Sequence, residues 1–148
     1  MSEEKVKGRF LGKAVLTVCF IICIGALIMS MYFGGQAKTV NECYTAAIRE
    51  NSSDMAELFA DEGAGSSVWE ALSQEYLSMQ SRFECEDNSI MHVRINFKGR
   101  RQSSLTEGDF LYTVTYYDDN VHDYTTGQRT MKLVREGTKW KIASADIQ

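Results

Sequence analysis

The apolar side chains are concentrated near the start of the chain. Residues 14–33 form a run of twenty almost wholly apolar side chains, and no charged residue lies between Lys13 and Lys38. At about 1.5 Å per residue, a helix of this length measures about 30 Å, the thickness of a bilayer's hydrocarbon core. The pattern predicts a membrane-spanning helix, with the lipid bilayer as the partner of residues 14–33.

The residues after this run change to the period of amphipathic helices. Thr39 and Glu42 have the spacing of a capping box, which predicts the start of a helix. Apolar side chains then recur three and four residues apart, as on the buried face of a helix. The predicted face consists of Val40, Cys43, Tyr44, Ala47 and Ile48.

Two further helices are expected before the pattern changes again. The polar residues 51–53 precede a short second helix, and the glycine-rich residues 63–65 predict its end. Ser67 and Glu70 repeat the capping-box spacing and predict the start of a third helix. Its expected buried face consists of Trp69, Leu72, Tyr76 and Met79.

From residue 90 onward the period becomes two, which is typical of strands. Residues 91–98 alternate between apolar and polar, and a polar connection is expected over residues 99–108. Residues 109–117 have aromatic and β-branched side chains on both faces and predict a central strand. After a turn-rich link over residues 118–127, two more strands, residues 128–135 and 139–147, form a predicted hairpin.

Helices that precede an antiparallel sheet define an α+β domain. This order, and the closing hairpin over residues 131–147 with Gly137 in its turn and Trp140 after it, resembles the nuclear transport factor 2-like superfamily. The resemblance covers residues 38–148 and implies a cone of three helices packed on a curved antiparallel sheet of about four strands. The layout also resembles small membrane-anchored bacterial domains of unknown function and, remotely, bitopic assembly components of type IV secretion systems.

Charge flanking the apolar run predicts the topology. Lys5, Lys7, Arg9 and Lys13 precede the run, so the positive-inside rule places residues 1–13 in the cytoplasm as a basic tail. Residues 14–35 then form the transmembrane helix, and residues 36–148 form one extracytoplasmic domain at the cell membrane. A cleaved signal peptide is an alternative, because Gly35 and Ala37 could form a cleavage site; a buried soluble helix is another.

The composition after the span is acidic. Residues 14–148 hold 12 lysines and arginines and 18 aspartates and glutamates, a net charge of −6. A domain of this charge repels phosphate backbones and anionic lipids, so we expect no nucleic acid partner.

Four cysteines divide between the two parts of the chain. Cys19 and Cys23 lie in the span, where cysteine is a small apolar residue. Cys43 and Cys85 lie outside it, where a disulfide is chemically permitted. Their pairing is left open.

No residue pattern indicates catalysis, a metal site or a cofactor. The resemblance suggests a pocket inside the cone, with six candidate lining residues: Tyr44, Trp69, Tyr76, Phe97, Tyr112 and Trp140. Tyrosines on apolar faces are usually core residues, and His92 shares a strand face with Arg94 and Lys98, which predicts solvation. Residues 118–123 are rich in metal-ligand types, but a solvated turn uses the same types.

The sequence leaves two main hypotheses of function, beside the plainer alternative that the anchor only positions a stable domain whose role depends on other proteins. The favoured hypothesis is a non-enzymatic interaction module that helps to scaffold or assemble an envelope or secretion complex, with an envelope protein or a second copy as its partner. The alternative is a cone with an apolar pocket that binds a small ligand or acts as an isomerase. A filled interior would favour the first hypothesis, and an open cavity with a buried carboxylate or histidine would favour the second.

Overall fold

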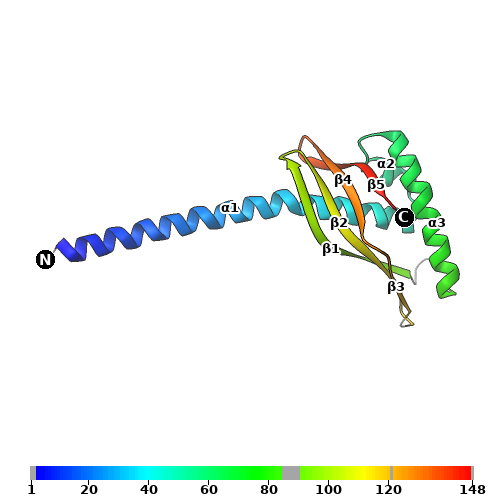
Figure 1. Cartoon of the computed structure of the whole chain (residues 1–148), viewed down its shortest axis with the longest axis horizontal. Coiled ribbons are helices and arrows are strands. Elements are labelled where there is room, and N and C mark those ends of the chain that lie inside the picture. The colour runs from blue at the N-terminus through cyan, green and yellow to red at the C-terminus, as the bar shows by residue number, and fades with distance from the viewer. Residues whose placement is uncertain (1–2, 85–90, 121, 148) are drawn as a thin grey trace. The chain divides into compact units, whose positions relative to one another are not determined.

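The computed structural model describes residues 3–84, 91–120 and 122–147, with side chains from Lys7 onward. The chain divides into two units, Met1–Gly34 and Gly35–Gln148. Helix α1 (Glu3–Ile48) belongs to both units, and the second unit, called here the domain, contains all the other elements (Figure 1).

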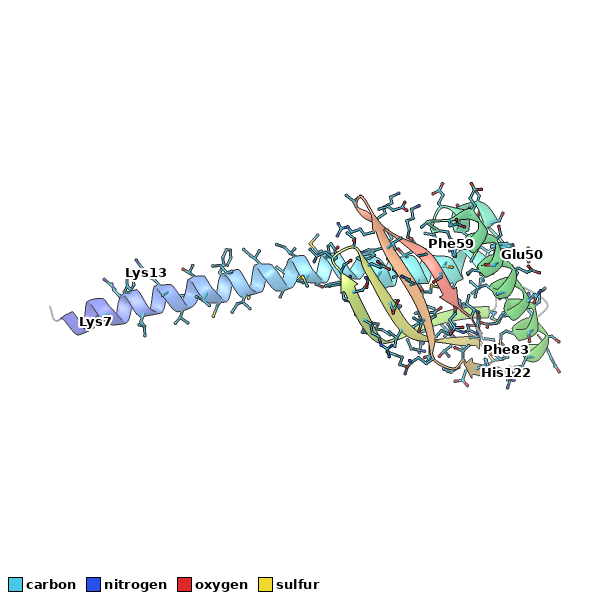
Figure 2. All side chains as sticks on the ribbon, turned by 45° about the horizontal axis from the view of Figure 1, so that its top comes forward. Lys7, Lys13, Glu50, Phe59, Phe83 and His122 are labelled. Atoms are coloured by element: carbon cyan, nitrogen blue, oxygen red, sulfur yellow. The ribbon has the colours of Figure 1, made fainter. Side chains whose placement is uncertain are left out.

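The first unit consists of the N-terminal part of α1. Lys7–Ile48 is long and apolar enough to cross a membrane, with a mean hydropathy of 2.6 in its most apolar window and no part of that window buried. Ile21, Ile22 and Leu27 are each more than 60% exposed. Figure 2 shows side chains projecting from this part of the helix between the labelled Lys7 and Lys13 and beyond.

The C-terminal part of α1 lies against the sheet. The strands cross it in Figure 1, and hydrogen bonds from Thr39 to β5 and from Tyr44 to β2 join these elements. The capping-box spacing predicted that Thr39 is a helix N-cap, and this prediction is wrong. Its hydroxyl donates to the Gly35 carbonyl at 3.0 Å, one turn back, and contacts the Trp140 carbonyl at 3.1 Å, because α1 continues through this position.

Two helices follow, α2 (Ser52–Ala56) and α3 (Glu62–Phe83). The predicted start of the third helix at Ser67 is wrong: α3 begins after Asp61, whose carboxylate accepts hydrogen bonds from the backbone N–H groups of Gly63 and Ala64. The glycines therefore lie inside the helix. Gly65 allows the helix to approach Phe59, whose Cγ lies 3.3 Å from where a Cβ would stand.

The sheet has five strands, one more than expected: β1 (Met91–Ser104), β2 (Glu107–Asp118), β3 (Asp123–Thr125), β4 (Arg129–Glu136) and β5 (Lys139–Asp146). They are antiparallel in the order β1-β2-β4-β5, and β3 pairs with β2. The α+β class and the closing hairpin are confirmed. The polar connection predicted over residues 99–108 is wrong, because β1 and β2 continue through it with two register shifts.

The core lies between the inner face of the sheet and the helices. Phe110, Tyr112, Val114 and Tyr116 of β2 are at most 1% exposed, as their alternation predicted. Opposite them, Val40, Cys43, Tyr44 and Ala47 of α1 are buried on one helical stripe. Phe59 and Ile142 form a parallel bridge that ties the segment after α2 to β5.

Two adjacent glycines provide a matched test of how tightly α1 packs on β5. A Cβ at Gly35 would stand 2.9 Å from Cδ1 of the buried Trp140, whereas a Cβ at Gly34 would meet nothing within 4 Å. We expect Gly35→Leu to lower the free energy of unfolding by about 1–3 kcal/mol through overpacking. Gly34→Leu should leave it unchanged or raise it slightly, since leucine favours helix. Denaturant unfolding of both variants in detergent, followed by tryptophan fluorescence, measures the difference; equal stabilities would contradict the packing.

Candidate functional site

Four elements bring polar side chains into the interior of the domain. Tyr44 comes from α1, Glu75 from α3, Tyr112 and Tyr116 from β2, and Arg129 from the first position of β4. Tyr112 and Tyr116 share a face because strand side chains alternate. Arg129 pairs in register with Tyr112, which places its side chain beside the tyrosines. We call these five residues the interior network.

Hydrogen bonds join every member of the interior network. The guanidinium of Arg129 binds the Glu75 carboxylate with two nitrogens, one of them 2.8 Å from Oε1. The same Nη1 donates to the Tyr44 hydroxyl at 3.1 Å, and the Tyr44 and Tyr112 hydroxyls are 3.0 Å apart. The Tyr116 hydroxyl donates to Oε1 of Glu75 at 2.5 Å. The Arg129 and Glu75 side chains are only 4% and 16% exposed, so this is a buried, fork-shaped ion pair.

The electrostatics of the network keep its tyrosines neutral. Burial raises the pKa of Tyr44 to about 12, even though Arg129 and the bond to Tyr112 act in the opposite direction. Burial also raises the pKa values of Tyr112 and Tyr116. For Tyr116, the negative charge of Glu75 is the second-largest cause of the rise in pKa. For Arg129, desolvation lowers the pKa, but its bonds to Glu75 and Tyr44 outweigh that effect and raise it.

This arrangement of side chains fits a structural role better than a role in acid–base catalysis. A general base needs a pKa near the working pH and access to a substrate proton. The tyrosines hold their protons more tightly than usual, and the Glu75 carboxylate is occupied by Arg129 and Tyr116. The Nε of Arg129 is the one atom of this network that is buried without a hydrogen-bond partner within the described residues. The network therefore connects α1 and α3 to the sheet.

Four of the six predicted lining residues are buried in the domain. Tyr44, Tyr76, Tyr112 and Trp140 are buried, with exposures of 5% or less, while Trp69 is half-buried. Phe97 is 54% exposed and rests against the Phe110 ring, with centroids 5.2 Å apart. Trp140 is also one of the residues that line the groove described below.

Glu75 and Arg129 were missed by the sequence analysis, although each carries a signal. Glu75 falls three residues after Leu72 and four before Met79, so it occupies the buried stripe of α3. Arg129 alternates with Met131 and Leu133 on the inner face of β4. One charge of each sign at predicted core positions indicates a buried ion pair.

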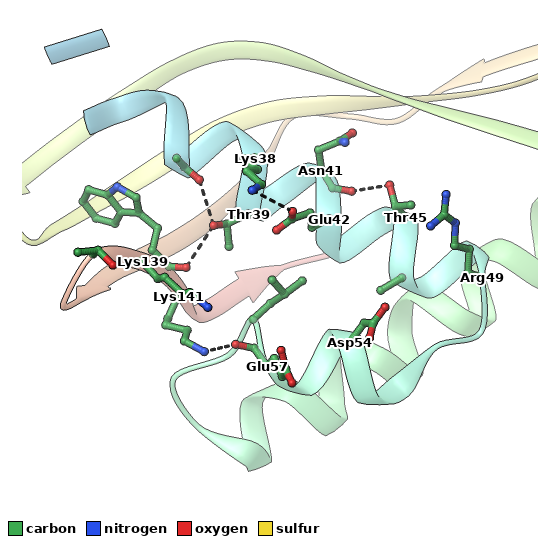
Figure 3. Close-up of a pocket in the computed structure, with 15 residues that line it drawn as sticks. Lys38, Thr39, Asn41, Glu42, Thr45, Arg49, Asp54, Glu57, Lys139 and Lys141 are labelled. Atoms are coloured by element: carbon green, nitrogen blue, oxygen red, sulfur yellow. Dashed lines mark hydrogen bonds and ion pairs between the residues drawn. The ribbon is translucent and has the colours of Figure 1, made fainter. Parts of the chain in front are cut away.

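The larger cavity is a groove of about 590 Å³ between α1, α2 and β5 (Figure 3). Its walls carry charges of both signs, and Trp140 contributes the aromatic surface. The charged lining residues are Lys38, Glu42, Arg49, Asp54, Glu57, Lys139 and Lys141. Lys38 pairs with Glu42 at 3.6 Å, and Lys141 donates to the Glu57 carbonyl, so part of this charge is internally satisfied. We call this cavity the charged groove.

A second cavity of about 540 Å³ lies between the end of α1 and β1. It is lined by Thr45, Ile48, Arg49, Met91, His92, Val93 and Tyr117. His92 is 43% exposed, as the strand alternation predicted, and its Nε2 lies 3.3 Å from Oδ1 of the more exposed Asp119. This contact is a surface ion pair when the histidine is charged.

The acidic turn after β2 is held by its own backbone. The Asp118 carboxylate accepts hydrogen bonds from the backbone N–H groups of Asn120 and His122, at 3.0 and 2.9 Å, and bonds Nδ1 of His122 at 2.9 Å. Desolvation raises the Asp118 pKa, but these bonds outweigh it and lower the pKa overall. His122 stacks on Phe83 of α3, and both are labelled in Figure 2. No group of metal-ligating side chains occurs among the residues that the structure describes.

Cys43 is buried in α1, and burial raises the pKa of its thiol to about 12. A thiol of this kind is unreactive. Cys85, the other cysteine of the pair that the sequence left open, lies outside the described residues, so the pairing stays open.

Several solved structures are similar to this chain, among them the following two. One, described as an NTF-2 like protein of unknown function from Shewanella oneidensis MR-1, is 10% identical with a TM-score of 0.49, covering 76% of this chain and 94% of that chain. The other, from Catenulispora acidiphila, is 15% identical with a TM-score of 0.47, covering 84% of this chain and 92% of that chain. No protein-family model and no curated protein matches the sequence. Likeness of this degree assigns neither an activity nor a partner.

Proposed function

We propose that this chain is a single-pass membrane protein whose extracytoplasmic domain is a non-enzymatic interaction module. Residues 14–33 anchor it in lipid, and the domain binds an envelope protein or a second copy of the chain. The observation that supports the proposal above all is the interior network, in which buried side chains from α1, α3, β2 and β4 are bonded to one another.

The anchor is supported by the composition and exposure of the first unit. Its most apolar window has a mean hydropathy of 2.6 and is wholly exposed, which is costly in water and favourable in a bilayer. The basic residues before this stretch favour a cytoplasmic N-terminus. The acidic domain then lies on the other side of the membrane.

The charged groove is the surface that best fits a protein partner. It is open and carries both signs of charge, and such surfaces give specificity through complementary charges on the partner. Its volume also falls within the range of about 300–1,000 Å³ for small-molecule sites, which is the observation that favours the ligand alternative. Against that alternative, ligand sites are mostly apolar, whereas seven charged side chains line this groove.

Native extraction from membranes tests the proposal. The full chain, isolated with its surrounding lipid, should migrate as a discrete complex larger than one chain. The variant Asp54→Lys/Lys139→Glu reverses charges on two walls of the charged groove at constant net charge and should dissociate that complex. The control Glu70→Lys/Arg82→Glu makes the same exchange at exposed positions of α3 and should leave it intact. A wild-type chain that migrates alone, or with only a small molecule bound, would contradict the interaction module.

A further inference from the structure

One segment of this acidic domain is strongly basic. Residues 91–106 contain Arg94, Lys98, Arg100 and Arg101 and no acidic residue, although the chain after residue 13 has a net charge of −6. One third of the domain's 12 basic residues therefore lies in a single stretch of sixteen residues. That stretch comprises β1 and the turn that leads into β2.

The far end of this hairpin presents both cations and apolar side chains to solvent. Lys98, Arg100 and Arg101 are exposed, and Phe97 and Leu105 are 54% and 75% exposed. The Arg100 guanidinium lies over the Phe97 ring, 5.2 Å from its centroid. We call residues 97–105 the hairpin tip.

The acidic residues nearby offset only part of this charge. Glu107 of β2 pairs with Lys132 at 2.5 Å, so its charge is already matched. Asp109 stands opposite Arg101 in the strand register. Lys98 lies at the register shift between Phe97 and Gly99, and Arg100 stands opposite Phe110.

The hairpin tip is tied to the start of the domain. Nε2 of Gln36, a side chain that is 1% exposed, lies 3.4 Å from Oε1 of Gln102 in the tip. Gln36 follows the apolar run by only three residues, which span at most about 11 Å in any backbone conformation. This bound holds whatever the orientation of the domain, so the tip stays within reach of the point where the chain leaves the apolar run.

We propose that the hairpin tip docks on anionic lipid headgroups of the membrane that holds residues 14–33. This inference rests on the proposed membrane anchor. The headgroup layer begins where the apolar run ends, and anionic headgroups in it attract lysine and arginine within a Debye length of about 10 Å. Phe97 and Leu105 enter the interface beside the cations, as aromatic and aliphatic side chains do in interfacial segments. The tether favours this partner over an acidic protein or a nucleic acid, because it keeps the surface within reach of the tip without any further binding event.

Fluorescence quenching in nanodiscs tests the docking. The full chain carrying Leu105→Trp is inserted into discs of phosphatidylcholine alone or mixed with phosphatidylglycerol, each with brominated acyl chains. The parent chain, which keeps Trp69 and Trp140, provides the emission to subtract. We expect quenching of the added tryptophan to be several-fold stronger in the anionic discs and to weaken with salt.

Charge variants give the matched comparison. Arg100→Glu/Arg101→Glu should abolish the excess quenching, and the milder Lys98→Gln/Arg101→Gln should reduce it. The control Ser78→Glu/Ser81→Glu/Arg82→Glu changes net charge equally at exposed positions of α3, outside the tip and the charged groove, and should keep the quenching. Equal unfolding midpoints for these variants exclude misfolding as the cause.

The outcomes separate this inference from the proposed function. Quenching that is equal in the two kinds of disc, or unchanged by the Arg100 and Arg101 substitutions, overturns the docking while the anchor stands. Binding of the tip to a soluble polyanion in place of the anionic disc also overturns it. A chain that is washed from the discs at alkaline pH overturns the anchor, and the docking with it.

Discussion

Replacing Arg129 with methionine is expected to lower the free energy of unfolding by about 3–5 kcal/mol. The substitution removes the counter-charge of Glu75, whose side chain is 16% exposed, and a donor to the Tyr44 hydroxyl. The Glu75 carboxylate would then remain in a low-dielectric interior with Tyr116 as its neighbour. Breaking a buried pair on one side costs far more than the net contribution of the pair, because one charge is left without compensation.

A double-mutant cycle distinguishes this mechanism from simple loss of packing. Glu75→Leu should be destabilising alone, and Glu75→Leu combined with Arg129→Met should recover much of the loss, since no charge is then buried. The recovery should be incomplete, because Tyr44 and Tyr116 lose polar partners. Lys132→Met on the same strand removes an exposed cation and should change little. Additive effects of the two interior substitutions, measured by denaturant unfolding in detergent, would refute the buried ion pair.

The second large effect is expected in the apolar run. Ile21→Arg combined with Ile24→Arg places two charges near the middle of residues 14–33, at positions 62% and 41% exposed. Each arginine at the centre of a spanning helix costs about 2.5–3.5 kcal/mol of insertion free energy, so the pair costs about 5–7 kcal/mol. That cost is comparable to the contribution of the apolar side chains in the run. The chain should therefore leave the membrane fraction that resists alkaline carbonate.

Conservative substitutions provide the control for this effect. Ile21→Leu with Ile24→Leu keeps the hydrophobicity and should keep the chain in the carbonate-resistant fraction. Retention of the double-arginine variant in that fraction would indicate that something other than the apolar run holds the protein to the membrane.

The strands were predicted best where one face is covered. Phe110, Tyr112, Val114 and Tyr116 are at most 1% exposed, whereas Leu111 and Thr115 between them are half-buried and Thr113 is 8% exposed, so the pattern of β2 is visible in the sequence. The second half of β1 is exposed on both faces, and such a strand has no apolar side to reveal it. Residues 99–108 therefore resemble a loop in composition although they form paired strands with bulges.

The helix starts were predicted poorly because a short spacing motif can occur inside a helix. Thr39 has a glutamate three residues later, but its hydroxyl serves the carbonyls of Gly35 and Trp140. Gly65 was interpreted as a helix stop, whereas it is the position where α3 meets Phe59. Both cases depend on contacts between distant segments, which local sequence does not contain.

The interior network also depends on contacts between segments that are distant in the sequence. The sequence places Glu75 and Arg129 on apolar stripes of two elements, yet 54 residues separate them. Their contact follows from the register of β4 on β2 and from the packing of the buried face of α3 in the domain. The tyrosines were identified correctly as core residues, but their partners were not.

Protease treatment of intact cells that make the full chain is the most direct test of the central claim. The account predicts that external protease removes the domain, Gly35–Gln148, and leaves in the membrane a fragment whose mass includes the uncleaved N-terminal residues. Digestion after cell lysis establishes that the folded domain can be cut. The account is contradicted if the domain resists protease until the cells are lysed, or if the mature protein is recovered in solution without residues 14–33.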